Sequence, residues 1–188
     1  MQCDPMIWDS AAFWDRRYAS GRTSGPGSEG DAARFKAETI NRLIAEYNIG
    51  SVVDWGCGDG TVLSMITDDV DYVGVDISRV ALRRLAQWSA HRRFVHLDDA
   101  AALTADLALS LDVIFHQVDN GNYHRHLEQI FGSARRLVLV HATDHDGGRT
   151  ATHVRWRRWT PDIPDGWQII ERPADPAAVG FYLCERTP

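Results

Sequence analysis

The chain has 188 residues, of which 44% are hydrophobic and 24% are charged, and its formal net charge is -6. This length and ordinary composition predict one globular domain, residues 1–188, with a sizeable hydrophobic core. We expect an N-terminal helical lid at 1–48 and a larger core unit at 49–188. The acidic balance disfavours a general nucleic-acid-binding protein, because such proteins carry a basic surface.

The three cysteines, Cys3, Cys57 and Cys184, are far apart in sequence and form no zinc-binding spacing. An odd number of cysteines without a secretory leader indicates a reducing compartment. The start of the chain, MQCDPMIWDS, has no basic region followed by a long apolar run. No stretch approaches the ~20 apolar residues needed to span a bilayer. We therefore expect a soluble, cytoplasmic protein without a membrane partner.

The N-terminal part of the chain predicts two helices joined by a loop. Apolar side chains at helical spacing indicate a short amphipathic helix over 7–19. A segment rich in glycine and serine follows at 21–28 and predicts a loop. Asp31 is expected to cap a second helix that runs to about Asn48, and Gly50 is expected to end it.

Short apolar strands then alternate with helices, which predicts an α/β fold with a doubly wound, mostly parallel sheet and helices on both faces. The predicted strands in this part are 51–55, 72–76, 94–97, 106–111 and 137–141. The helices predicted between them are 61–67, 78–90 and 123–134. A polar insertion is expected at about 143–166. Two further strands, 167–171 and 181–185, bring the expected sheet to seven strands.

A glycine-rich turn, Asp54-Trp55-Gly56-Cys57-Gly58-Asp59-Gly60, follows the first predicted strand. Glycines let the backbone bend sharply and approach a ligand closely, and the helix predicted after the turn would offer free N–H groups. A dinucleotide-binding turn needs a third glycine where this chain has Thr61, so the spacing disfavours that class. Acidic residues also follow the next two predicted strands, at Asp76 and at Asp98-Asp99.

These motifs resemble those of class I S-adenosylmethionine-dependent methyltransferases, which have a Rossmann-like fold. The resemblance implies S-adenosylmethionine as cofactor and S-adenosylhomocysteine as its product. In that family the acidic residue matching Asp76 accepts hydrogen bonds from both ribose hydroxyls, and the one at Asp98-Asp99 binds the adenine amino group. The cofactor-binding residues implied in this chain are Tyr18, Lys36, Asp54, Gly56, Cys57, Gly58, Gly60, Asp76, Ile77, Asp98, Asp99 and Ser110.

Within this resemblance the front of the chain has a possible part in cofactor binding. Tyr18 and the loop at 21–28 are placed to fold over the cofactor, and Lys36 or Arg34 could meet its methionine carboxylate. The alternative is that these residues only cover the edge of the sheet.

Four segments are similar to a narrower group, the small bacterial methyltransferases of polysaccharide and glycoside biosynthesis. The segments are Phe13–Tyr18, Thr23–Ser28, Phe35–Glu38 and Ala105–Ile114. The resemblance implies O-methylation of a sugar hydroxyl, in a mannoside or oligosaccharide, and allows a homodimer. The alternatives are N- or O-methylation of another small metabolite, or a non-catalytic cofactor-binding subunit. No Asn-Pro-Pro-Tyr-type sequence follows the fourth strand, which disfavours amino-group methylation of nucleic acid or protein.

Two strand ends are rich in titratable side chains, and both should lie at the edge where a doubly wound sheet binds ligands. A hydroxyl acceptor benefits from a general base, and histidine is the natural base near neutral pH. His141, at the carboxyl end of the fifth strand, is the first candidate and His116 is the second. The carboxylate candidates are Asp112 and Asp144.

The same strand ends could instead hold a divalent metal, because oxygen-rich sites suit magnesium. Asp119 and Asp144 would then be its ligands. A simple base mechanism requires fewer coincidences, so we expect no metal.

The segment from His153 to Trp159 mixes basic and aromatic side chains. Such a mixture could bind nucleic acid, line a sugar site, or form a surface ribbon whose tryptophans face the core. The net acidity of the chain disfavours nucleic acid. The candidates for acceptor binding are Tyr123, His153, Arg155, Trp156 and Arg158.

Overall fold

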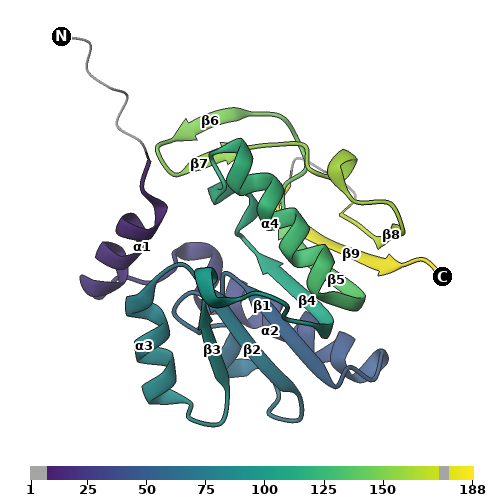
Figure 1. Cartoon of the computed structure of the whole chain (residues 1–188), viewed down its shortest axis with the longest axis horizontal. Coiled ribbons are helices and arrows are strands. Elements are labelled where there is room, and N and C mark those ends of the chain that lie inside the picture. The colour runs from purple at the N-terminus through teal and green to yellow at the C-terminus, as the bar shows by residue number, and fades with distance from the viewer. Residues whose placement is uncertain (1–7, 174–177) are drawn as a thin grey trace.

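The computed structural model describes residues 8–173 and 178–188. A seven-stranded sheet with the order β3-β2-β1-β4-β5-β9-β8 forms its centre (Figure 1). The strands are β1 (Ser51–Trp55), β2 (Asp71–Asp76), β3 (Arg93–His96), β4 (Ala105–Leu111), β5 (Ala134–Ala142), β8 (Trp167–Glu171) and β9 (Gly180–Arg186). The first five pair in parallel, and β9 runs antiparallel to both β5 and β8. The predicted doubly wound, mostly parallel sheet is confirmed.

Four α-helices accompany the sheet in the described part of the chain: α1 (Ser10–Ala19), α2 (Gly30–Glu46), α3 (Arg79–Trp88) and α4 (Asn120–Ser133). Five short 3₁₀ turns lie between the other elements: η1 (Pro26–Ser28), η2 (Leu63–Met65), η3 (Leu97–Asp99), η4 (Ile114–His116) and η5 (Thr160–Asp162). The predicted polar insertion contains a separate hairpin of β6 (Gly148–Ala151) and β7 (Val154–Trp156). No described helix is both long and apolar enough to cross a bilayer.

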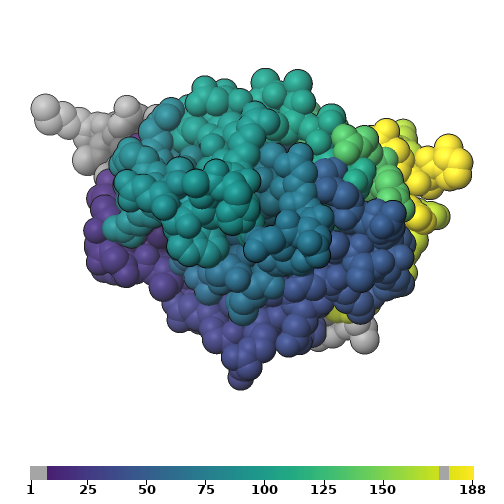
Figure 2. All heavy atoms as spheres, turned by 90° about the horizontal axis from the view of Figure 1, so that it is seen from below, coloured from purple at the N-terminus to yellow at the C-terminus, as the bar shows by residue number. Residues whose placement is uncertain are grey.

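Both faces of the sheet are buried. Successive side chains of a strand point to opposite faces, so each strand contributes to two core clusters. On β4, Leu107 and Leu109 pack in the cluster that includes α2, whereas Ala108 packs in the cluster that includes α4. Leu137 and Val138 of β5 divide in the same way. A strand that is buried on both faces must be apolar along most of its length, and the sequences of β4 and β5 have this pattern. Seen from below, the surface consists mainly of the first half of the chain, and the C-terminal strands emerge at one end (Figure 2).

The helix boundaries at the front of the chain differ slightly from the prediction. The expected helix at 7–19 begins at Ser10, where Asp9 accepts a hydrogen bond from the backbone of Ala12 (2.9 Å). Ile7, expected on its apolar side, lies outside the described residues. Asp31 lies in the first turn of α2 rather than capping it. Asn48, with a positive φ of 50°, provides the reversal expected from Gly50.

The helix predicted at 61–67 is wrong, because only the three-residue turn η2 forms there. Side chains from distant segments bind the carbonyls that a helix would use internally. Arg92 donates to Leu63 O and Ile66 O (2.9 Å each), and the amide of Asn41 donates to Met65 O (2.9 Å). A segment this short gains too few hydrogen bonds to repay helix nucleation. The glycine-rich turn is therefore not followed by an α-helix whose N-terminal dipole could point at a ligand.

The strand order reverses between β1 and β4, which are neighbours although β2 and β3 come between them in sequence. Ligands of doubly wound sheets bind beyond the carboxyl ends of the strands at this switch point. Asp54 and Trp55 end β1 there, and Asp112 directly follows β4.

Candidate active site

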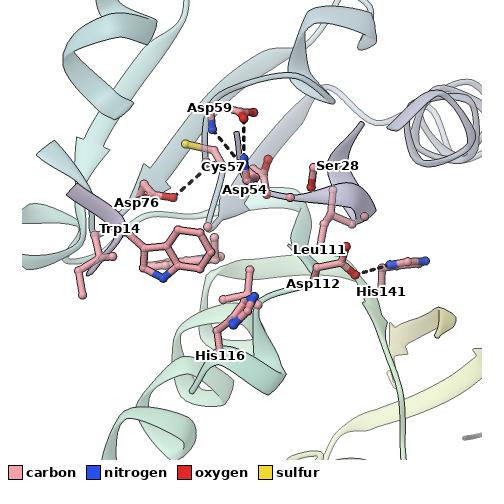
Figure 3. Close-up of a pocket in the computed structure, with 18 of the residues that line it drawn as sticks. Trp14, Ser28, Asp54, Cys57, Asp59, Asp76, Leu111, Asp112, His116 and His141 are labelled. Atoms are coloured by element: carbon pink, nitrogen blue, oxygen red, sulfur yellow. Dashed lines mark hydrogen bonds and ion pairs between the residues drawn. The ribbon is translucent and has the colours of Figure 1, made fainter. Parts of the chain in front are cut away.

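A cavity of about 810 Å³ lies at the switch point, beneath α1 and the loop at 21–28 (Figure 3). Nine of the predicted cofactor-binding residues line it: Tyr18, Lys36, Asp54, Gly56, Cys57, Gly58, Asp76, Ile77 and Asp98. Three others lie outside the lining: Gly60, Asp99 and Ser110. Ser110 is fully buried, and its hydroxyl bonds the ring of His126 on α4 (2.8 Å).

The glycine-rich turn is tied to the end of β2 by its backbone. The N–H groups of Gly56 and Cys57 both donate to Val75 O (2.7 and 3.0 Å), and Gly58 N–H donates to Asp76 Oδ2 (2.9 Å). Gly58 has a φ of +58°, and a Cβ there would lie 2.5 Å from Ser24 Oγ. Glycine is required because the turn is left-handed and the loop passes directly over it.

The N-terminal segment is fastened over this turn. The hydroxyls of Tyr18 and Ser24 are hydrogen-bonded (3.0 Å), and Ser24 N–H donates to Asp59 Oδ2 (2.7 Å). Arg84 of α3 donates to Tyr18 O (2.7 Å). Tyr18 is buried, and its burial raises the pKa of the phenol. The lid position proposed for Tyr18 and the loop therefore agrees with these contacts.

Three carboxylates surround the turn, at Asp54, Asp59 and Asp76. Asp54 is buried and accepts a hydrogen bond from the Tyr72 hydroxyl (2.7 Å), and burial raises its pKa to about 6. Its second oxygen, Oδ1, is buried without a partner among the described residues. Asp76 is also buried, which raises its pKa, although the N–H groups of Ser78 and Gly58 bind the carboxylate.

This arrangement suits a cationic ligand better than a phosphate. Carboxylates repel phosphates, and the helix dipole that dinucleotide sites use is missing here. S-adenosylmethionine carries a sulfonium and an ammonium group and no phosphate. The unpartnered oxygen of Asp54 and the free acceptor capacity of Asp76 therefore fit this cofactor.

On the other side of the cavity, Asp112 joins two basic side chains. Its Oδ2 pairs with Lys36 Nζ, which also donates to Gly27 O (2.5 Å), and its Oδ1 accepts from His141 Nδ1 (2.6 Å). Burial opposes ionisation, but the hydrogen bond from His141 and the charge of Lys36 hold the pKa of Asp112 below its ordinary value. Because a carboxylate only accepts, the proton of a neutral His141 lies on Nδ1, which leaves Nε2 as a base.

His116 enters the same cavity from η4, and Figure 3 shows it pointing toward Trp14. Its Nδ1–H donates to His153 O (2.7 Å), so its neutral ring also keeps Nε2 as an acceptor. The ring stacks on that of His153, with centroids 5.4 Å apart, and meets the edge of Trp14 at 5.1 Å. Burial lowers the pKa of His116 to about 4, so this imidazole remains neutral at physiological pH.

The other predicted carboxylates do not join these groups. Asp144 accepts from the backbone N–H groups of Trp159 and Thr160 (2.8 and 3.0 Å) and holds the η5 turn. Asp119 caps α4 by accepting from Asn122 N–H (3.0 Å). In the described part of the chain, no three His, Cys, Asp or Glu side chains are grouped as metal ligands would be.

Of the predicted acceptor-binding residues, His153 contributes to the lining that the described residues form. Four others lie outside it: Tyr123, Arg155, Trp156 and Arg158. Trp156 packs behind the lining, against the ring of Phe115 (5.0 Å). Arg155 donates to the side chain of Asn120 (3.0 Å), so it links the hairpin to α4.

Several lining residues were not predicted from the sequence. Trp14 and Phe115 add aromatic surface, and α4 adds the polar side chains of Asn122, Arg125 and Gln129. The spacing of three and seven residues on α4 places these polar groups on one helix face. That polar stripe is a signal from which the α4 wall of the cavity could have been predicted.

Comparisons with known proteins agree with this architecture. A profile of the methyltransferase domain family matches residues 29–172. No curated protein matches the chain by sequence.

Several solved structures share the fold. Magnesium protoporphyrin IX methyltransferase from Synechocystis PCC 6803, solved with S-adenosylhomocysteine, is 16% identical, with a TM-score of 0.66 and 95% of each chain covered. The CcbJ methyltransferase from Streptomyces caelestis is 14% identical, with a TM-score of 0.70 and coverage of 96% of this chain and 100% of the other. The N-methyltransferase NodS from Bradyrhizobium japonicum WM9 is 14% identical, with a TM-score of 0.67 and coverage of 95% and 98%.

Replacement of Gly58 by alanine is expected to weaken binding of S-adenosylhomocysteine at least about tenfold, or 1.4 kcal/mol. The added Cβ would force Ser24 and the loop off the turn. Calorimetric titration measures the affinity. Gly132→Ala is the matched control, because that helical glycine has no atom within 4 Å of a built Cβ. Native affinity in a folded Gly58→Ala protein would show that the lid contact plays no part in binding.

The stability of the ligand-free protein should depend on the protonation of Asp54. Burial raises the pKa of Asp54 to about 6, above the roughly 3.9 of an exposed aspartate. The folded state then binds the proton more tightly than the unfolded chain. The stability from Asp54 is therefore present below about pH 4 and is lost as pH rises through about 6.

Asp54→Asn keeps an acceptor for Tyr72 but cannot ionise. Its stability relative to the native protein should rise by on the order of 2 kcal/mol between about pH 4 and pH 7.5. Urea unfolding at the two pH values gives this difference. If the free energies of unfolding of the variant and the native protein differ by the same amount at both pH values, Asp54 does not titrate in this range.

Proposed function

Since the chain belongs to the methyltransferase domain family and is an S-adenosylmethionine-dependent methyltransferase, we propose that it methylates a hydroxyl group of a sugar. The main support is the Asp112–His141 pair on the cavity wall, because methylation of a hydroxyl benefits from a general base. The sequence also resembles the sugar 1-O-methyltransferase of mycobacterial methylmannose polysaccharide synthesis, which favours a mannoside or oligosaccharide acceptor.

The glycine-rich turn and its carboxylates would hold the cofactor, which supplies an electrophilic methyl group when bound. Asp76 accepts hydrogen bonds from the N–H groups of Gly58 and Ser78, and it would offer its remaining acceptor capacity to the ribose hydroxyls. Asp54 would offer its unpartnered oxygen to a positive charge. Asp98, which is exposed at the cavity rim, would accept from the adenine amino group.

His141 would act as the general base. A sugar hydroxyl is a poor nucleophile until its proton is taken, and His141 Nε2 can accept that proton. Asp112 fixes the ring through Nδ1 and stabilises the imidazolium that forms. Lys36 holds Asp112 from the opposite side, so Lys36 and Asp112 act as positioning residues.

His116 would take a different part. Its low pKa makes it a weak base, but its neutral ring is a good hydrogen-bond acceptor. Stacking on His153 and the hydrogen bond to the His153 carbonyl fix its orientation. We assign His116 to orientation of the acceptor, through a hydrogen bond that its Nε2 would accept from a second hydroxyl, so its substitution should raise KM more than it lowers kcat.

His141→Ala should lower turnover by roughly 10²–10⁴-fold, because the acceptor proton loses its base. Affinity for S-adenosylhomocysteine should hardly change. Transfer of labelled methyl to a panel of glycosides measures turnover, calorimetric titration measures the affinity, and His124→Ala, at an exposed histidine outside the cavity lining, is the control.

Near-native turnover in His141→Ala would contradict the assignment and move the base role to His116 or Asp112. If neither of those substitutions slows the reaction, positioning alone suffices. Transfer to amines but not to glycosides would favour N-methylation of another metabolite. Cofactor binding with no transfer to any acceptor would favour a non-catalytic subunit.

Chelation by EDTA should leave turnover unchanged. Asp119 and Asp144, the carboxylates considered as metal ligands, are engaged by backbone N–H groups. The rate of methyl transfer is compared in EDTA and in added magnesium. Loss of activity in EDTA that magnesium restores would instead identify a metal-dependent reaction.

A further inference from the structure

Three apolar side chains, Ala32, Phe35 and Val179, line the mouth of the cavity and also face solvent. We call them the apolar rim. Phe35 is 57% exposed and Val179 is 48% exposed, although both belong to the cavity that contains His141. A single exposed apolar residue needs no explanation, but several grouped at the opening of a pocket indicate a ligand surface.

The rim is connected to the proposed base by aromatic contacts. The Phe35 ring packs on that of Phe181, with centroids 5.5 Å apart, and the Phe181 ring packs on that of His141 at 4.7 Å. An apolar strip therefore runs from the imidazole to the solvent. Its parts lie on α2, β9 and β5, which are regular elements of the core.

Phe35 lies outside the buried face of the helix that carries it. Its neighbours Ala33 and Ala37 are fully buried and pack in the core beneath α2. Lys36 points inward to Asp112. Phe35 instead projects to the side of the cavity mouth, where a bound molecule would cover its exposed face.

We propose that the acceptor is amphiphilic: the hydroxyl that reaches His141 belongs to a molecule whose apolar substituent lies on the rim. The substituent is an alkyl or aryl group, such as the aglycone of a glycoside. This inference rests on the proposed function for the hydroxylated part. The apolar rim would favour such a substituent because contact removes apolar surface of both the rim and the substituent from water. The gain in affinity increases with the apolar area covered.

The test uses two glycosides that share one head group, methyl mannoside and octyl mannoside, the latter below its micelle concentration. Calorimetry with S-adenosylhomocysteine present gives both affinities without requiring turnover. The native protein should bind the octyl compound about tenfold more tightly. Phe35→Gln should remove most of this preference and leave the affinity for methyl mannoside unchanged.

Trp88→Gln is the matched control. Trp88 is also 57% exposed and helical but lies outside the cavity lining, so its substitution should keep the full preference. Equal affinity of the native protein for the two glycosides, or a preference that survives Phe35→Gln, overturns the inference. Loss of the preference in Trp88→Gln as well also overturns it, because it indicates nonspecific adsorption.

Methyl transfer to the same two compounds separates this inference from the proposed function. Rim-dependent binding of octyl mannoside without methyl transfer overturns the sugar acceptor and leaves the rim intact. Methyl transfer to both glycosides with no alkyl preference overturns the rim and leaves the proposed function intact.

Discussion

The Asp112 carboxylate organises the acceptor side of the cavity. It directly follows β4 with a φ of +60°, a conformation that a non-glycine residue adopts at a cost. The carboxylate binds Lys36 from α2 and His141 from β5, and Lys36 reaches onward to the backbone of Gly27 in the lid loop. One partly buried charge thus binds the side chains that hold the lid loop and the imidazole at the same end of the sheet. Removing it would leave Lys36 buried without its counter-ion, which is costly.

The glycine-rich turn on the other side of the cavity differs, because carboxylates surround it and no α-helix follows it. Arg92 and Asn41 bind the carbonyls that would have continued a helix after the turn, so no helix N-terminus points at the ligand. Asp54 and Asp76 instead bring buried carboxylates close to it. Desolvation raises the pKa of both groups, so their ionisation depends on what occupies the cavity. A cationic ligand favours the ionised forms and is bound more tightly for the same reason.

The sequence predicts the parts of the fold that depend on local pattern. The strands and the glycine-rich turn follow from apolar runs and from the backbone freedom of Gly58, and strand ends bring Asp112 and His141 to one edge. The missing helix at 61–67 was not predictable from local pattern, because Arg92 and Asn41, which bind its carbonyls, are remote in sequence. The hydrogen bonds of Asp144 were equally hidden, since its partners lie on a turn that only tertiary packing brings back.

The lid joins the acceptor side through aromatic stacking as well as through charge. Phe13 and Trp14 of α1 pack on the rings of His153 and His116, which come from the insertion and from η4. In the proposed function, the segment that would cover the cofactor therefore also forms one wall for the acceptor. Trp14 of α1 packs on His116, so any displacement of α1 would also change the wall around His116. Binding of the cofactor is therefore expected to raise the affinity for the acceptor, because α1 placed over the cofactor completes the surface that receives the acceptor.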